Sequence, residues 1–174
     1  MTRTIALFAA LALAAPAALA HATFENREVA QNSTVRMVTR IPHGCGAEAT
    51  LRVRVAIPEG VISVKPMPKA GWDLEIVRGP YERSYELWGA TITEGVRELI
   101  WTGELPDEHY DEFVWRARFT DALPAGETLY IPVVQECATS AERWIEIPAA
   151  GQSGADLAYP APGVKVTPAA GGGH

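Results

Sequence analysis

The sequence predicts an all-β fold, an antiparallel β-sandwich, and two observations carry this prediction. Short segments alternate between apolar and polar residues, which is the two-residue period of a half-buried strand. Turn-forming clusters separate these segments, and the chain contains 15 Gly and 13 Pro in 174 residues. Beyond the first twenty residues, no long segment shows the 3.6-residue period of an amphipathic helix.

About nine short strands are expected, and two of them are especially clear. In residues 51–57 the odd positions are apolar while Arg52 and Arg54 occupy even positions. Residues 113–120 alternate in the same way. The shorter strand candidates are residues 35–41, 61–65, 72–77, 85–88, 97–101, 128–134 and 143–147. The turn clusters between them are residues 58–60, 69–71, 78–80 and 123–126.

Residues 1–20 are expected to be a cleaved signal peptide. Arg3 gives a basic start, residues 5–15 form an apolar run, and Ala18-Leu19-Ala20 fits the small-x-small pattern of signal-peptidase sites. The apolar run is short for a membrane span, and no later segment approaches twenty apolar residues, so no membrane anchor is expected. The mature protein is therefore expected to begin at His21 in the periplasm.

The end of the chain has a different composition. Of the 26 residues in 149–174, 16 are Ala, Gly or Pro, and large apolar residues are few. Such a segment buries too little surface to offset the entropy lost on ordering. We expect a flexible C-terminal tail there, and a folded domain that spans residues 21–148.

Composition and motifs exclude several classes of function. The formal net charge is −6, and no basic cluster suggests a nucleic-acid partner. The sequence has no nucleophile elbow, P-loop, zinc-protease helix or dinucleotide fingerprint. We therefore expect a binding protein and not an enzyme.

The two cysteines, Cys45 and Cys137, are 92 positions apart, which fits neither a CxxC redox motif nor a zinc knuckle. In an oxidising compartment a structural disulfide is the expected state. The alternative is a pair of thiolates that binds Cu(I) or zinc.

Signal cleavage would give His21 unusual chemistry. Its free α-amine and its imidazole Nδ1 belong to one residue, so both can bind the same metal ion. Deprotonating the amine at neutral pH costs only about 1 kcal/mol. Paired nitrogen donors suit Cu(II), which binds most tightly among the divalent metals of its row. Carboxylates that could add an oxygen ligand lie nearby in the sequence at Glu25, Glu28 and Glu48.

Further motifs follow along the mature chain in a fixed order. They are His21-Ala22-Thr23, Pro42-His43-Gly44-Cys45, residues 53–60 (VRVAIPEG), 65–72 (KPMPKAGW), 101–103 (WTG), 105–107 (LPD), 110–113 (YDEF), 132–137 (PVVQEC) and 144–148 (WIEIP). In these motifs the chain resembles the YcnI-like family of exported copper-binding proteins. The resemblance covers nearly the whole mature domain.

The resemblance implies an immunoglobulin-like β-sandwich that binds Cu(II) in a single-histidine brace. His21 corresponds to the N-terminal histidine, which supplies the amine and the imidazole, and Trp144 to a tryptophan beside the metal. Glu48 is the expected carboxylate ligand, with Glu28 as the alternative. An indole N–H only donates, so Trp144 would shield the metal and not bind Cu(II) strongly.

The expected function is copper trafficking or homeostasis, with a copper transporter or another periplasmic copper protein as partner. One alternative is an oxidative enzyme of the copper polysaccharide monooxygenase type, which needs a second histidine such as His43 or His109. The other is a metal-free secreted interaction domain. His43 is more simply a turn residue, and His174 ends a glycine-rich segment that could reach exposed copper.

Overall fold

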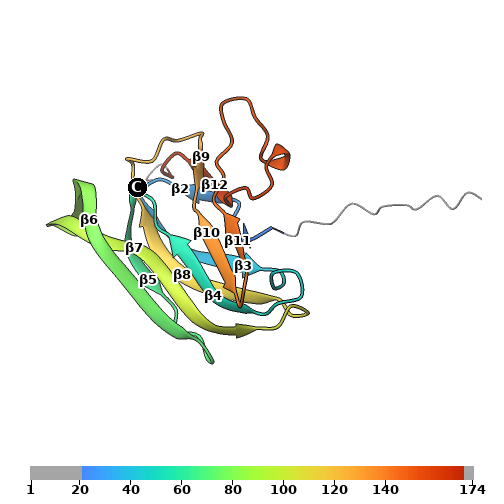
Figure 1. The fold of residues 1–174 in the computed structure, drawn as a ribbon. Coiled ribbons are helices and arrows are strands. Elements are labelled where there is room, and N and C mark those ends of the chain that lie inside the picture. The colour runs from blue at the N-terminus through green and yellow to red at the C-terminus, as the bar shows by residue number, and fades with distance from the viewer. Residues whose placement is uncertain (1–20, 171–174) are drawn as a thin grey trace, which may run out of the picture.

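The computed structural model describes residues 21–170. The expected signal peptide and His174 lie outside the described residues. The predicted sandwich is confirmed: two antiparallel sheets pack face to face (Figure 1). Among the described residues, no helix is long and apolar enough to cross a membrane.

The first sheet has the strand order β1-β3-β8-β5 and the second the order β11-β10-β4-β7-β6. The strands of the first sheet are β1 (Thr23–Phe24), β3 (Ser33–Ile41), β8 (Asp111–Phe119) and β5 (Val61–Pro66). Those of the second are β11 (Ala141–Trp144), β10 (Val133–Cys137), β4 (Thr50–Ala56), β7 (Ala90–Leu105) and β6 (Asp73–Leu87).

The core lies between these sheets and is built by the alternation seen in the sequence. In β8, Phe113, Trp115 and Phe119 are fully buried while Arg116 between them is exposed. Trp101 of β7 and Phe113 bring the two sheets together, with ring centroids 5.4 Å apart. Aromatic rings of this size bury large apolar areas, so they account for much of the stability of a sandwich.

The structure differs from the sequence expectation for the C-terminal segment. Gly163–Thr167 forms strand β12, which pairs parallel with β2 (Glu28–Ala30) and antiparallel with β9 (Thr128–Tyr130). A short 3₁₀ helix, η1 (Gly154–Asp156), precedes it. Val164 and Val166 are buried while Lys165 is exposed. Burial of these two valines and pairing with β2 and β9 outweigh the Ala/Gly/Pro-rich composition, so the expected flexible tail is wrong for residues 149–170, and the fold extends past residue 148.

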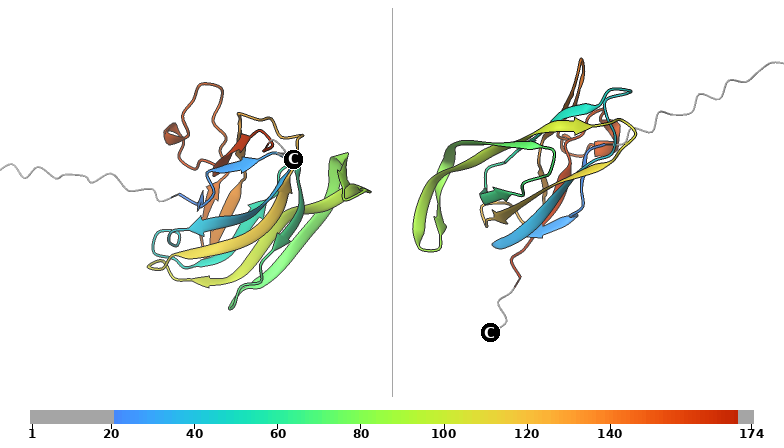
Figure 2. Two further views of the ribbon diagram at one scale, coloured as in Figure 1. Left: turned by 180° about the vertical axis from the view of Figure 1, so that it is seen from behind. Right: turned by 90° about the horizontal axis from the view of Figure 1, so that it is seen from below.

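A second difference concerns the long β6–β7 hairpin, which projects from the sandwich (Figure 2, right). Residues 78–80, expected to be a turn, lie inside β6, where the pairing with β7 only shifts register. The chain reverses instead at Trp88 and Gly89, which both have positive φ, 51° and 80°. Two expected short strands, 72–77 and 85–88, are therefore parts of one strand.

The disulfide prediction is confirmed. Cys45 and Cys137 are bonded, with Cα atoms 6.1 Å apart. The bond joins the loop between β3 and β4 to the end of β10. This loop is the region in which the sequence placed the carboxylate ligand.

Candidate metal centre

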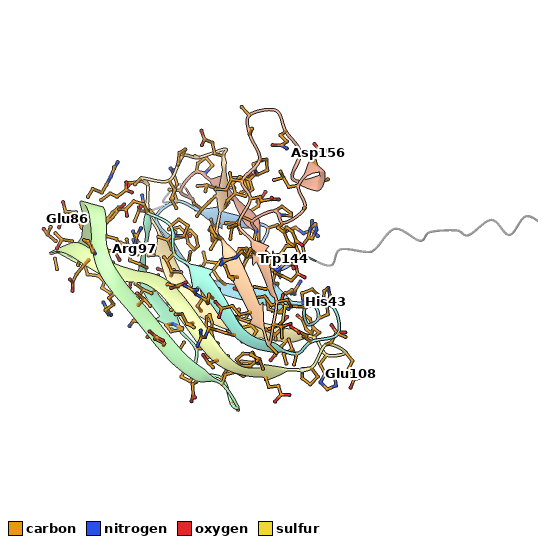
Figure 3. The ribbon with its side chains drawn as sticks, viewed as in Figure 1. His43, Glu86, Arg97, Glu108, Trp144 and Asp156 are labelled. Carbon is orange, nitrogen blue, oxygen red and sulfur yellow. A yellow bond between two sulfur atoms is a disulfide. The ribbon has the colours of Figure 1, made fainter. Side chains whose placement is uncertain are left out.

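The structure brings His21 and Trp144 together from distant parts of the chain. His21 lies just before β1, and Trp144 is the last residue of β11. Their ring centroids are 5.1 Å apart with an interplanar angle of 50°. Trp144 is labelled in Figure 3, near the point where the described chain begins. The ring of Tyr159 lies 5.4 Å from Trp144, so three rings cluster here.

Two polar atoms of this cluster lack partners. His21 Nε2 and Trp144 Nε1 are buried without a hydrogen bond among the described residues. Buried polar groups in folded proteins nearly always have a partner, and each exception calls for a functional or structural reason. Because Nε2 is enclosed by protein, Nδ1 is the ring nitrogen left for an incoming ligand. Nδ1 is also the ring nitrogen that is fewer bonds away from the backbone nitrogen of the same residue.

A cavity of about 480 Å³ opens beside His21. It is lined by His21 and the residues that follow it up to Arg27, by Arg40, and by the segment from Pro160 to Gly163. The carboxylate in this lining is that of Glu25. Its Oε2 lies 2.8 Å from Arg40 Nη2, so its charge is already balanced by a cation.

The structure holds Glu48 outside the lining of this cavity. Its carboxylate accepts hydrogen bonds from the Thr139 hydroxyl, from the Thr139 amide at 3.1 Å and from the Ser140 hydroxyl at 2.9 Å. These bonds, above all that from the Thr139 side chain, lower the pKa of Glu48. Thr139 and Ser140 form the turn of the β10–β11 hairpin, whereas Trp144 ends β11, about 13 Å further along an extended strand.

Glu28 also lies outside the lining of this cavity. It lies in β2 opposite Lys165 of β12, and its side chain is exposed. The two carboxylates expected from the sequence are thus both separate from the histidine in this conformation, and Glu25 replaces them at the cavity.

The other described histidines are engaged in loops. His43 Nδ1 lies 2.6 Å from the Gly44 carbonyl oxygen and 3.9 Å from Asp107 Oδ1. Its own carbonyl accepts a 2.6 Å hydrogen bond from Gln135 Nε2, which fixes the loop. His109 is exposed, with Glu108 as its charged neighbour at 3.8 Å.

The donor groups near His21 are few. Within residues 21–170, no group of three or more His, Cys, Asp or Glu side chains is placed to hold a metal ion. A single-histidine brace takes two nitrogens from one histidine and adds one carboxylate, which is fewer than three such side chains. The enclosed Nε2, the neighbouring indole and the adjacent cavity fit that simpler arrangement. The sequence did not single out Tyr159 or residues 160–163, because they lie in the segment taken for a tail.

Comparisons with known proteins agree with the fold. The chain is similar to an uncharacterized protein from Nocardia farcinica whose crystal structure reveals an immunoglobulin-like fold. The TM-score is 0.61 at 20% identity, over 84% of this chain and 98% of that one. Among curated proteins, none matches. Residues 21–166 match the family model described as "Domain of unknown function (DUF1775)". The chain therefore belongs to the DUF1775 family.

Proposed function

We propose that the protein binds Cu(II) at the amine and imidazole of His21, and serves copper trafficking or homeostasis after export to the periplasm. The observation that supports this most directly is the packing of His21 on the buried ring of Trp144, with Nε2 enclosed and a cavity alongside. Trp144 limits how the imidazole can turn and keeps water from one side of it. The role is binding and transfer, not catalysis, and the partner is a copper transporter or another copper protein.

When bound, copper would supply a charge that holds the amine and the imidazole together. Both nitrogens must be unprotonated to bind, so acidification should release the metal. A carboxylate would offset part of the cupric charge. Glu48 and Glu28 are proposed for that role from the family resemblance, and Glu25 from its place in the cavity lining.

The three carboxylates differ in the interactions that each would lose on binding copper. Glu48 would have to leave Thr139 and Ser140, and Glu25 would have to leave Arg40. Glu28 makes no ion pair in the part of the chain that the structure describes. Single Glu→Gln variants at the three positions keep the shape of the side chain and remove its charge. The variant that weakens copper binding most therefore identifies the oxygen ligand.

The decisive experiment is a Cu(II) titration of the chain beginning at His21, followed by electron paramagnetic resonance. We expect one tightly bound equivalent with nitrogen hyperfine couplings. Placing one glycine before His21 converts the amine to an amide, and should weaken binding by orders of magnitude while the circular dichroism stays the same. His109→Ala is the matched control, because that histidine is exposed and does not line the cavity beside His21. Equal affinity with and without the added glycine would refute the proposal.

A further inference from the structure

Three cationic side chains lie in a row on the outer face of the β1-β3-β8-β5 sheet. Arg36 of β3 is directly opposite Arg116 of β8, and Arg116 is directly opposite Lys65 of β5. All three are exposed, while their neighbours Met37 and Trp115 point into the core. Figure 2 (left) shows this sheet from the side opposite to Figure 1. Facing residues of antiparallel strands have Cβ atoms about 4.5–5.5 Å apart, and like charges there destabilise the sheet.

No carboxylate within residues 21–170 neutralises this row by an ion pair. Glu112 shares the face, but its carboxylate is bound by Arg40, with Nε 3.3 Å away, and by the Tyr110 hydroxyl. The chain carries more acidic than basic residues, 21 against 15, so acids are plentiful. The uncompensated row is thus a local feature that opposes the overall charge.

The row borders a cavity of about 380 Å³ whose remaining walls are apolar. These walls are formed by Pro66, Met67, Pro68 and Val114, and Trp115, whose side chain is buried in the core, also borders the cavity. Met67 is 53% exposed, so its apolar side chain is accessible to a ligand in this cavity. Pro66 and Pro68 lack backbone N–H groups, so this end of β5 is poorly suited to pairing with another strand. The cavity therefore favours a ligand over an added strand.

We propose that this cavity binds an amphipathic organic anion, a carboxylate or phosphate group carried on an apolar body. The guanidinium groups of Arg36 and Arg116 match such oxyanions in shape and charge, and Lys65 adds a third cation. The apolar body lies against Met67 and Val114, and the flexible thioether of Met67 adapts to its shape. Binding also relieves the mutual repulsion of the three cations. A free amphiphile and a lipid headgroup share this chemistry.

Titration calorimetry of the chain beginning at His21, without copper and at low salt, tests this site with octanoate and octyl phosphate. Octylammonium and octanol are the matched probes without a negative charge, and acetate is the probe without an apolar body. We expect octanoate and octyl phosphate to bind at least tenfold more tightly than octylammonium, octanol or acetate. Arg116→Gln should weaken them at least tenfold, and added salt should also weaken them. Arg83→Gln is the control, because Arg83 is an exposed cation beside a different cavity.

Two further measurements complete the test. Without ligand, the Arg116→Gln variant should unfold at a higher temperature than the unaltered protein. The substitution removes the repulsion of Arg116 with Arg36 on one side and with Lys65 on the other. If Arg116→Gln does not fold, Arg36→Gln and Lys65→Gln provide the same comparison. Cosedimentation with phosphatidylglycerol vesicles, against phosphatidylcholine vesicles, distinguishes a bilayer headgroup from a free amphiphile. Absence of Arg116-dependent binding to both the soluble anions and the anionic vesicles would overturn the proposal, as would equal weakening by Arg83→Gln.

Discussion

Removal of the disulfide should lower the free energy of unfolding by about 4–5 kcal/mol. Cys45 and Cys137 are separated by 92 residues. In the chain-entropy model, closing a loop of this length restricts the unfolded chain by about 4.6 kcal/mol at 25 °C. Since single domains are stable by only about 5–15 kcal/mol, this is a large fraction of the total. The contribution arises mainly in the unfolded state, so the native fold should persist in the reduced protein.

The native contacts support this expectation. The loop that carries Cys45 remains attached through Glu48, which binds Thr139 and Ser140, and through Gln135, which donates to the His43 carbonyl. Urea unfolding of the oxidised protein should be compared with that of the Cys45→Ser/Cys137→Ser variant. The two should share a native circular dichroism spectrum and differ in unfolding midpoint. A difference below about 1 kcal/mol would refute the reasoning, and detection of two free thiols in the untreated protein would favour the thiolate alternative.

Three further outcomes are expected. Ending the chain after residue 148 should cost at least about 3 kcal/mol in urea unfolding, because it removes the buried side chains of Val164 and Val166; unchanged stability would mean that β12 adds nothing. Burial raises the pKa of Tyr85 from 10.0 to about 12. The stability that the neutral Tyr85 side chain contributes is therefore complete below pH 10 and is lost as the pH rises toward 12. In Tyr85→Phe, the free energy of unfolding should no longer fall with this pH dependence. Cu(II) should quench tryptophan fluorescence less in Trp144→Phe than in Trp88→Phe, since Trp88 is 80% exposed at the hairpin tip; equal quenching would place the metal away from Trp144.

The strands that were predicted well are those in which one face is buried and the other exposed. Residues 51–57 correspond to β4 within one residue at each end, and residues 113–120 to β8 within two residues at its start and one at its end. Their alternation is strong because each belongs to a sheet with one side in the core. The β6–β7 hairpin was divided wrongly because most of β6 is exposed on both faces, so its sequence carries little periodicity.

The C-terminal strand was missed for a different reason. Gly163–Thr167 has only two buried side chains, and the surrounding composition hides their spacing. What holds the strand in place is pairing with β2 and β9, which lie far away in the sequence. Local patterns contain no information on such partners.

The candidate site was predictable only in part. The pairing of His21 with Trp144 followed from the family resemblance, and the structure brings the two rings together. The carboxylate could not be predicted, because its position depends on how the disulfide and the Thr139–Ser140 turn hold the loop. The family resemblance favoured Glu48 and then Glu28 over Glu25, and only the fold shows that Glu25 lines the cavity.

Because β2 pairs with β12, the N-terminal part of the fold is completed only when the C-terminal residues have been synthesised. A ribosome produces His21 early, yet the residues that enclose it, Trp144 and the segment from Pro160 to Gly163, are produced near the end. Because contacts between distant residues form slowly, His21 spends the period of synthesis without the residues that enclose it. An incomplete chain therefore presents an open, poorly shielded imidazole. His21 is therefore fully enclosed only after the whole chain has been synthesised and folded.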